Sequence, residues 1–336
     1  MAGWKREVVA SAGILHAAAA GDHGVAWACG ILPQESGRFA TLIFRRHGQG
    51  WEQAEAPQIG RVNRALAVSD ADIWAVGDGR SLHWDGLRWQ KVPTAVIQGS
   101  QPQFFGLVQF GADDVWTAGY APTRDYRQAR GTVQRWDGSA WRDLPMPAVA
   151  ASWSLSGIAG ASPQDVWAVG QVHGERNDPL ALHFDGQEWQ HVPVPGPEGR
   201  SIQLSDIAVL GNGDAWAAGY KWDSGGIRTR QPFAVHWNGQ AWAAGEVPEG
   251  PGQITQLASD GKKLWGLGYA APTAPYVAAL EGTSWQVIPG PPELPEAHTA
   301  LHGGTILSDG SLLAVGASSM PDNSTRPFAA VLSSHL

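Results

Sequence analysis

A repeated six-residue pattern constrains the fold of this 336-residue chain more than any other feature. Residues 165–170 read Asp-Val-Trp-Ala-Val-Gly, and closely similar copies stand at 72–77, 114–119 and 214–219. Each copy is followed by a second pattern of an aromatic residue, Asp or Asn, Gly, two variable residues and Trp, at 84–89, 136–141, 184–189 and 237–242. The chain is therefore built from repeats.

The period of the repeat predicts its architecture. Successive copies of the first Trp lie 42 to 51 residues apart, at Trp27, Trp74, Trp116, Trp167, Trp216 and Trp265, with Leu313 in the seventh place. Four short apolar runs per copy at this period are typical of a β-propeller, in which each blade is a four-stranded antiparallel sheet. For residues 196–248 we expect strands at 202–209, 215–220, 233–237 and 241–247.

The two ends of the chain are expected to meet in one blade. Seven copies of the first pattern are followed by only six copies of the Trp that ends the second pattern, and Trp4, near the N-terminus, supplies the seventh. The six are Trp51, Trp89, Trp141, Trp189, Trp242 and Trp285. An N-terminal outer strand would leave no open sheet edge at the junction. We predict an all-β, seven-bladed propeller in a single domain over 1–336, with that strand at 1–10 and blades at 11–57, 58–93, 94–147, 148–195, 196–248, 249–292 and 293–336.

Composition narrows the function classes. A net charge of -8 argues against nucleic acid as a partner, because such proteins usually carry a basic footprint. The single cysteine, Cys29, excludes an intramolecular disulfide and is expected to be a small buried hydrophobe. Neither a membrane-spanning apolar run nor a signal peptide is found, so we expect a complete cytoplasmic protein that acts as a monomer without a membrane partner.

The repeated residues have structural explanations. Asp before the Trp strand can accept hydrogen bonds from turn amides. Gly of the second pattern permits the positive φ of a tight hairpin, and the paired Trp side chains supply area for packing one blade on the next. Three histidines recur at one place of the third strand and should lie in separate blades, which favours a scaffold role over a metal site: His83, His183 and His236.

Sequence divergence is concentrated in the loops of one face. The connections between second and third strands are long at 32–38, 120–131, 173–179, 220–232, 269–276 and 317–327, as are crossings between blades such as 145–153 and 289–299. These loops are rich in Arg, including Arg228, and hold or border all five Tyr residues. Arg and Tyr favour recognition because both offer area and directional hydrogen bonds. The candidate ligand-binding residues here are Tyr120, Tyr126, Arg127, Tyr220, Trp222, Arg230 and Tyr269.

The channel mouth on that face should be ringed by the starts of the first strands. Alignment of these strands predicts a varied ring, which suits a pocket with a few polar groups among apolar ones. Its expected members are His16, Arg64, Phe105, Trp153 or Ser156, Gln203 or Ser205, Thr255 and His302.

No catalytic motif is recognised in the sequence. Gly211, Asn212 and Gly213 form a turn and have no strand-to-helix context that would make a phosphate loop. His298 and His302 are four residues apart but outside a helix, so no metal site is predicted, and no cofactor is expected, although a metal stays open. A triad of His16, His302 and an acid such as Asp206 at the mouth is the open catalytic alternative.

Over nearly the whole chain, the paired patterns resemble the tryptophan-rich β-propeller repeats of many bacterial proteins. The resemblance implies the fold and leaves the activity open, because propellers host several functions. The leading hypothesis is a binding module for a peptide, a protein or a small polar or anionic ligand on the loop face. An alternative is an enzyme of the lyase, cyclase or hydrolase type, such as a biosynthetic enzyme, with its active site at the channel mouth. A second is a carbohydrate-binding lectin, which should keep the same sugar-binding side chains in several blades.

Overall fold

The computed structural model describes residues 3–97, 99–211, 214–223, 229–270, 274–293 and 297–333. The described residues form seven four-stranded antiparallel sheets. Blade 1 contains β2 (Ile14–Ala20), β3 (Ala26–Pro33), β4 (Phe39–His47) and β5 (Gly50–Gln53). Blade 2 contains β6 (Val62–Ser69), β7 (Asp72–Gly77), β8 (Ser81–Trp84) and β9 (Trp89–Val92). Blade 3 contains β10 (Gln103–Gly111), β11 (Asp114–Pro122), β12 (Ala129–Trp136) and β13 (Trp141–Asp143).

The remaining blades repeat this order. Blade 4 contains β14 (Trp153–Ser162), β15 (Asp165–Val172), β16 (Asp178–Phe184) and β17 (Trp189–His191). Blade 5 contains β18 (Ser201–Gly211), β19 (Asp214–Trp222), β20 (Gln231–Trp237) and β21 (Trp242–Ala244). Blade 6 contains β22 (Gln253–Ser259), β23 (Leu264–Ala270), β24 (Ala274–Glu281) and β25 (Ser284–Ile288). Blade 7 contains β26 (His298–Ile306), β27 (Leu312–Ser319), β28 (Thr325–Leu332) and β1 (Trp4–Glu7).

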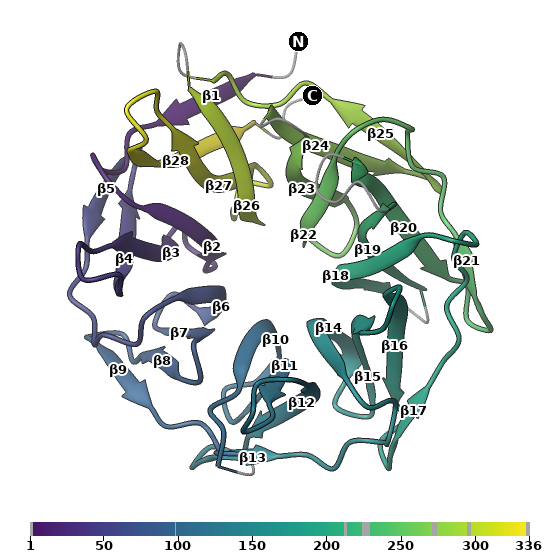
Figure 1. Cartoon of the computed structure of the whole chain (residues 1–336). Helices are drawn as coiled ribbons and strands as arrows, with labels where there is room; N and C mark the ends of the chain where they lie inside the picture. The colour runs from purple at the N-terminus through teal and green to yellow at the C-terminus, as the bar shows by residue number, and fades with distance from the viewer. Residues whose placement is uncertain are drawn as a thin grey trace.

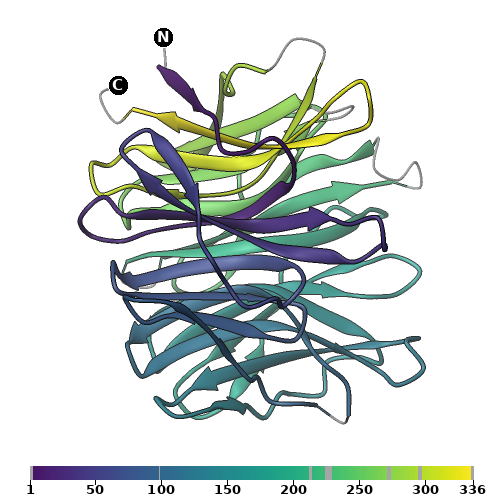
Figure 2. The ribbon, with the colours of Figure 1, turned by 90° about the vertical axis from the view of Figure 1, so that its left-hand side faces the viewer.

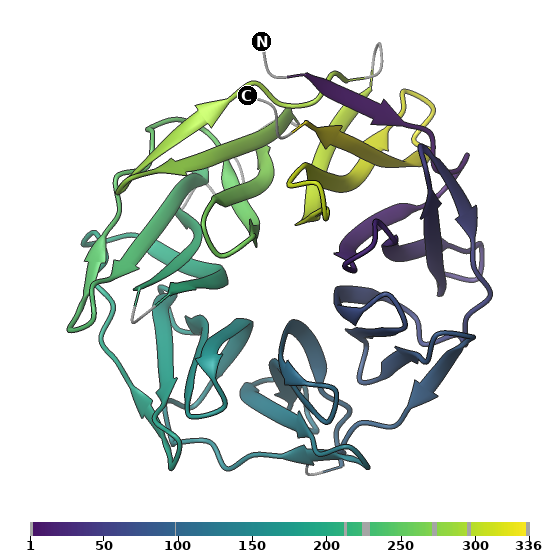
Figure 3. The same ribbon diagram turned by 180° about the vertical axis from the view of Figure 1, so that it is seen from behind.

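The blades form a ring, and the first strand of each lies at the centre (Figures 1 and 3). The predicted all-β, seven-bladed propeller is therefore confirmed. The predicted strands of blade 5 lie within a few residues of the observed bounds, and the largest difference is that β21 begins at Trp242 and ends at Ala244. No helix long and apolar enough to cross a membrane occurs among the described residues.

The N-terminal strand completes blade 7, as predicted. Trp4 pairs with Leu332 and Glu7 with Ala329 in an antiparallel register, and both ends of the chain lie at the same blade (Figure 2). The indole N–H of Trp4 donates to the carbonyl of Pro289 at 2.8 Å, which ties this strand to blade 6. The ring is thus closed by strand pairing between the two ends of the chain, which removes an open sheet edge.

The paired tryptophans join successive blades. The first Trp of one blade packs against the second Trp of the next, so that Trp27 meets Trp89 at a ring-centroid distance of 5.2 Å and Trp167 meets Trp242 at 5.2 Å. The same contact recurs in three other blade pairs: Trp74 with Trp141, Trp116 with Trp189 and Trp216 with Trp285. These side chains are almost completely buried, so the repeat stabilises the interfaces between blades through apolar area and edge-to-face contacts.

The Asp of the first pattern has a different role from the one expected. Asp72 accepts a hydrogen bond from His83 Nε2 at 2.7 Å, across to the third strand, and the imidazole stacks on Trp74 at 4.3 Å. The same Asp, His and Trp arrangement recurs in blades 4 and 5, with His183 and His236. Turn amides are instead bonded by the Asp or Asn of the second pattern, such as Asp85, beside a glycine of positive φ, Gly86.

The Gly of the first pattern is required by close backbone approach. A Cβ on Gly170 would lie 2.0 Å from the carbonyl oxygen of Ser154, and a Cβ on Gly219 would lie 1.9 Å from that of Gln203. In all seven blades a Cβ on this Gly would meet a backbone carbonyl oxygen in, or immediately before, the first strand. Because the obstacle is backbone, it cannot move aside as a flexible side chain would.

Two sites named from the sequence, Arg228 and the turn residues Asn212 and Gly213, lie outside the described residues.

Candidate functional site

A β-bulge in the first strand of every blade builds the site. In each blade the register shifts by one residue where the strand faces the channel, for example between Leu15 and Ala17 in β2. The extra residue is left unpaired, and its side chain is re-aimed. The seven bulge residues all line one central cavity: His16, Asn63, Phe105, Ser156, Ser205, Thr255 and His302.

The cavity has a volume of about 760 Å³ and opens on the face of the long loops. The seven bulge residues form a ring, here called the bulge ring. Above it, the cavity wall continues with the residues that follow the repeated Gly of the second strands: Tyr120, Gln171, Tyr220 and Tyr269. These pair with the starts of the first strands, and the Tyr220 hydroxyl donates to Gln203 Oε1 at 2.8 Å. The repeat thus delivers a different side chain from each blade to one shared space.

The layer below the bulge ring narrows the channel. The residue after each bulge is small in four blades: Ala17, Gly106, Gly157 and Gly303. In the other three it is Arg64, Asp206 or Gln256. The small residues leave room for the large ones, because a Cβ on Gly303 would lie 2.2 Å from Gln256 Oε1 and one on Gly157 would lie 2.9 Å from Asp206 Oδ1.

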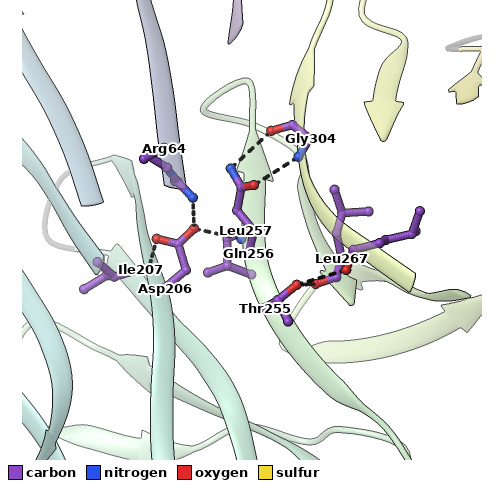
Figure 4. Close-up of polar contacts among 9 residues, drawn as sticks. Arg64, Asp206, Ile207, Thr255, Gln256, Leu257, Leu267 and Gly304 are labelled. Carbon is purple, nitrogen blue, oxygen red and sulfur yellow. Dashed lines mark hydrogen bonds and ion pairs between the residues drawn. The ribbon is translucent and has the colours of Figure 1, made fainter. Parts of the chain in front are cut away.

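An ion pair connects opposite sides of the ring at this level (Figure 4). Arg64 Nη1 lies 2.8 Å from Asp206 Oδ2, which joins blade 2 to blade 5, and the Asp206 side chain is only 2% exposed. The same carboxylate accepts the backbone N–H groups of Ile207 and Leu257, each at 2.9 Å. The Gln256 side-chain amide donates to the carbonyl of Gly304 at 3.3 Å and accepts the N–H of Gly304 at 3.0 Å. Arg64 and Gln256 line both this cavity and a second one toward the other face, so they separate the two.

Two imidazoles meet on one side of the cavity. The rings of His16 and His302 are 5.5 Å apart, and Tyr269 lies 6.1 Å from His302. Burial lowers the pKa of His16 to about 3, with further contributions from His302 and Arg61, and burial lowers the pKa of His302 to about 4. Both side chains are therefore neutral at pH 7. His16 Nδ1 lies 3.3 Å from the carbonyl of Val62, which fits a protonated Nδ1 and leaves Nε2 as an acceptor.

These lowered pKa values predict a pH-dependent stability. Below pH 6.5, the unfolded chain binds protons at His16 and His302 that the folded chain does not, so the free energy of unfolding falls as the pH falls toward 4. Between pH 7 and pH 5 the expected loss is about 2 kcal/mol per histidine. Urea unfolding at both pH values should show that the free energy of unfolding of His302→Gln falls by about 2 kcal/mol less than that of the wild type. The exposed His47→Gln serves as the control, and equal losses for His302→Gln and the wild type would contradict the prediction.

The cavity is cationic. Three arginines line it, Arg61, Arg64 and Arg230, and none of its described lining residues is Asp or Glu. Arg230 lies over the ring of Tyr220 at 4.3 Å and donates from Nη1 to Gln253 Oε1 at 2.6 Å. The Nε atoms of Arg61 and Arg230 are buried without a hydrogen-bond partner among the described residues. Such groups are suited to a ligand with anionic oxygens, because charge-assisted hydrogen bonds are stronger than neutral ones.

Most of the residues expected at the mouth lie in this cavity. The predicted residues that line it are His16, Arg64, Phe105, Tyr120, Ser156, Gln203, Ser205, Tyr220, Arg230, Thr255, Tyr269 and His302. Trp153 does not, because it is 4% exposed and packs in the core between blades 3 and 4. Tyr126 and Arg127 are on the exposed loop between β11 and β12, and Trp222 packs beside Tyr220 at 5.3 Å. Their roles in ligand binding stay predictions.

Several cavity residues were missed from the sequence. Arg64 was assigned to the ring, but the bulge residue of β6 is Asn63, and Arg64 reaches the cavity from the layer below. Alignment on the buried apolar residue before each bulge, such as Val62 or Leu204, would have corrected this register. Arg61 was missed because it lies just before the strand. Asp206 was named as a catalytic acid, but its carboxylate is paired with Arg64 below the cavity.

Among the described residues, no group of three or more His, Cys, Asp or Glu side chains is placed to hold a metal ion. Cys29 is buried in blade 1, and burial raises its pKa to about 12. Among the residues that line the cavity, the groups available to a ligand are hydrogen-bond donors, neutral imidazoles and aromatic rings.

Solved structures share the fold at low sequence identity. YCF48 bound to D1 peptide is 14% identical, with a TM-score of 0.61, and the match covers 99% of this chain and 96% of that one. An ulvan lyase of the polysaccharide lyase family PL25, bound to -[GlcA(1-4)Rha3S]-, is 12% identical, with a TM-score of 0.63 and coverage of 96% and 95%. The polysaccharide lyase Uly1 is 12% identical, with a TM-score of 0.58 and coverage of 94% and 90%. No protein-family model and no curated protein sequence matches the chain.

Proposed function

We propose that this protein is a binding propeller that holds a polar ligand by its anionic group in the central cavity of the loop face. The observation that carries the proposal is the presence of Arg61 and Arg230, beside the paired Arg64, in a cavity whose described lining residues include no acid. The cavity volume lies in the usual range for small-molecule sites, roughly 300 to 1,000 Å³. A peptide or protein could present the same group as an acidic side chain, and the peptide-bound neighbour is compatible with such a partner.

Matched pairs of charged and neutral probes test this function. Glucuronate and glucuronamide, adipate and adipamide, and an acidic tripeptide with its amide form would be screened by thermal shift. The charged member of at least one pair should raise the melting temperature, because a ligand that binds only the folded state stabilises it. Arg230→Gln should reduce that shift, whereas Arg127→Gln should not, because Arg127 is on the same face but outside the cavity. Equal shifts for charged and neutral members would contradict the proposal.

The second candidate is an enzyme that uses the His16, His302 and Tyr269 cluster in the same cavity. Two structural neighbours are polysaccharide lyases, so acidic polysaccharides are the first substrates to assay, by the absorbance of an unsaturated product. The low pKa values of both histidines make them weak bases, which places this candidate second. His302→Gln should abolish any turnover and retain binding; retained turnover would remove His302 from the mechanism.

A lectin with several equivalent sugar sites is the least supported alternative. The seven bulge residues are of five different types, so successive blades do not present one recurring sugar-binding side chain to the cavity. A repeat lectin is expected to reuse the same groups in several blades.

A further inference from the structure

We propose that the cavity takes a small molecule with two anionic groups, one bound by Arg61 and the other by Arg230. The inference rests on the proposed function and adds the number and placement of the charges. It follows from which of the three cavity arginines already has a charge partner and from where the other two lie.

Arg64 has its charge partner within the protein. Its guanidinium lies 2.8 Å from the Asp206 carboxylate, and the two side chains are only 17% and 2% exposed. Positive and negative charge are therefore matched at the floor of the cavity. An anionic ligand placed against Arg64 would also lie close to Asp206, and that carboxylate would repel it. Arg64 thus forms a floor for the ligand and contributes little net attraction.

Arg61 provides an unmatched charge on the blade 2 side. It stands immediately before β6 and lines the cavity, and its guanidinium lies over the ring of Phe39 at 5.1 Å, a contact that does not cancel its charge. Its Nε is buried without a hydrogen-bond partner there, and its positive charge contributes to the lowered pKa of His16, which places the group beside this cavity. The carboxylate of Asp78 accepts the backbone N–H of Arg61 at 3.1 Å and lines a separate outer pocket. Burial raises the pKa of Tyr120 in the cavity, Arg61 lowers it, and the charge of Asp78 also acts there and raises it.

Arg230 provides the second unmatched charge, on the side of blades 5 and 6. Its contacts are with the Tyr220 ring and with the neutral amide oxygen of Gln253, neither of which cancels its charge. Its Nε is also buried without a partner among the described residues. The positive charge of Arg230 acts on Tyr220 by lowering its pKa, against the larger effect of burial, which raises that pKa.

The two arginines lie on different walls of one cavity. β6 and the strands β18 and β22 stand on opposite sides of the ring (Figure 1), and the span between them is the one that the Arg64 and Asp206 pair crosses at the floor. A ligand with one anionic group can pair with only one of the two arginines. A ligand with two anionic groups can pair with both, and each charge-assisted contact is expected to strengthen binding by about 10-fold or more.

Calorimetric titration with dicarboxylates tests the inference. Succinate, adipate and suberate would be compared with butyrate, hexanoate and octanoate, which have the same lengths and one carboxylate each. At least one dicarboxylate should bind about 10-fold more tightly than its monocarboxylate counterpart. Arg61→Gln or Arg230→Gln should each remove that advantage, the lysine variants should retain part of it, and Arg127→Gln should leave it unchanged. Circular dichroism would establish that each variant is folded.

The outcomes separate this inference from the proposed function. If monocarboxylates bind as tightly as dicarboxylates and Arg230→Gln weakens both, the two-anion inference is overturned and the proposed function stands. Binding of poly-glutamate in the absence of binding by every dicarboxylate would overturn the inference of a small molecule. If no charged probe of either experiment binds, both the inference and the proposed function fail.

Discussion

Replacement of Asp206 by Ala is expected to lower the free energy of unfolding by about 3 to 5 kcal/mol, the range for a buried pair that loses one partner. The Arg64 guanidinium would be left in a largely buried position without its carboxylate, and the backbone N–H groups of Ile207 and Leu257 would lose their acceptor. Both effects follow from the desolvation of charged and polar groups that have no replacement partner.

Urea unfolding followed by tryptophan fluorescence measures this loss. Asp125→Ala is the control, because Asp125 is 60% exposed and lies 3.9 Å from Arg127, so its replacement should leave the free energy of unfolding nearly unchanged. Joint replacement by Arg64→Met and Asp206→Leu should recover much of the stability, since an apolar pair removes both buried charges. A loss below about 1 kcal/mol for Asp206→Ala would show that the pair does not hold the channel floor.

Replacement of Glu7 by Ala should have an effect of similar size, about 3 to 5 kcal/mol, at the closure of the ring. Glu7 is 4% exposed at the end of β1 and accepts hydrogen bonds from Arg46 Nε at 2.9 Å and from the Trp51 indole at 2.9 Å. The carboxylate thus links the N-terminal strand of blade 7 to blade 1. Its removal leaves the Arg46 charge, which is 15% exposed, without its ion-pair partner.

The measurement is again urea unfolding, with Glu52→Ala as the matched control. Glu52 is 78% exposed and lies 3.5 Å from His47, so its removal should cost little. If Glu7→Ala and Glu52→Ala had equal stability, the contact between β1 and blade 1 would not contribute to closure of the ring.

The fold could be predicted from the sequence because its repeating residues make its repeating contacts. Trp167 and Trp242 lie in corresponding places of neighbouring blades, and the Gly after each first Trp is fixed by backbone approach. Trp4 identified the closing strand for the same reason, because it is the seventh copy of the Trp that ends the second pattern, and its strand pairs in blade 7.

The site could be predicted only in part. Apolar and polar alternation has a period of two and does not reveal the extra residue of a β-bulge, so Arg64 was placed where Asn63 stands. The partner of Arg64 is 142 residues away in the sequence, and nothing in either local segment indicates the pairing. Alignment of the strand starts left Trp153 and Ser156 as alternatives for one place in the ring. Ser156 is the bulge residue that lines the cavity, whereas the large apolar side chain of Trp153 fills the core between two blades.

The central claim is that the cavity binds a ligand through anionic charge, and the affinity ratio of adipate to adipamide tests it most directly. The two molecules have nearly the same shape, so the ratio isolates the charge. At pH 7 and low salt, calorimetry should give adipate an affinity about 10-fold or more above that of adipamide, and the ratio should fall with added salt. Equal affinities of the two molecules, unchanged by salt, would contradict the account.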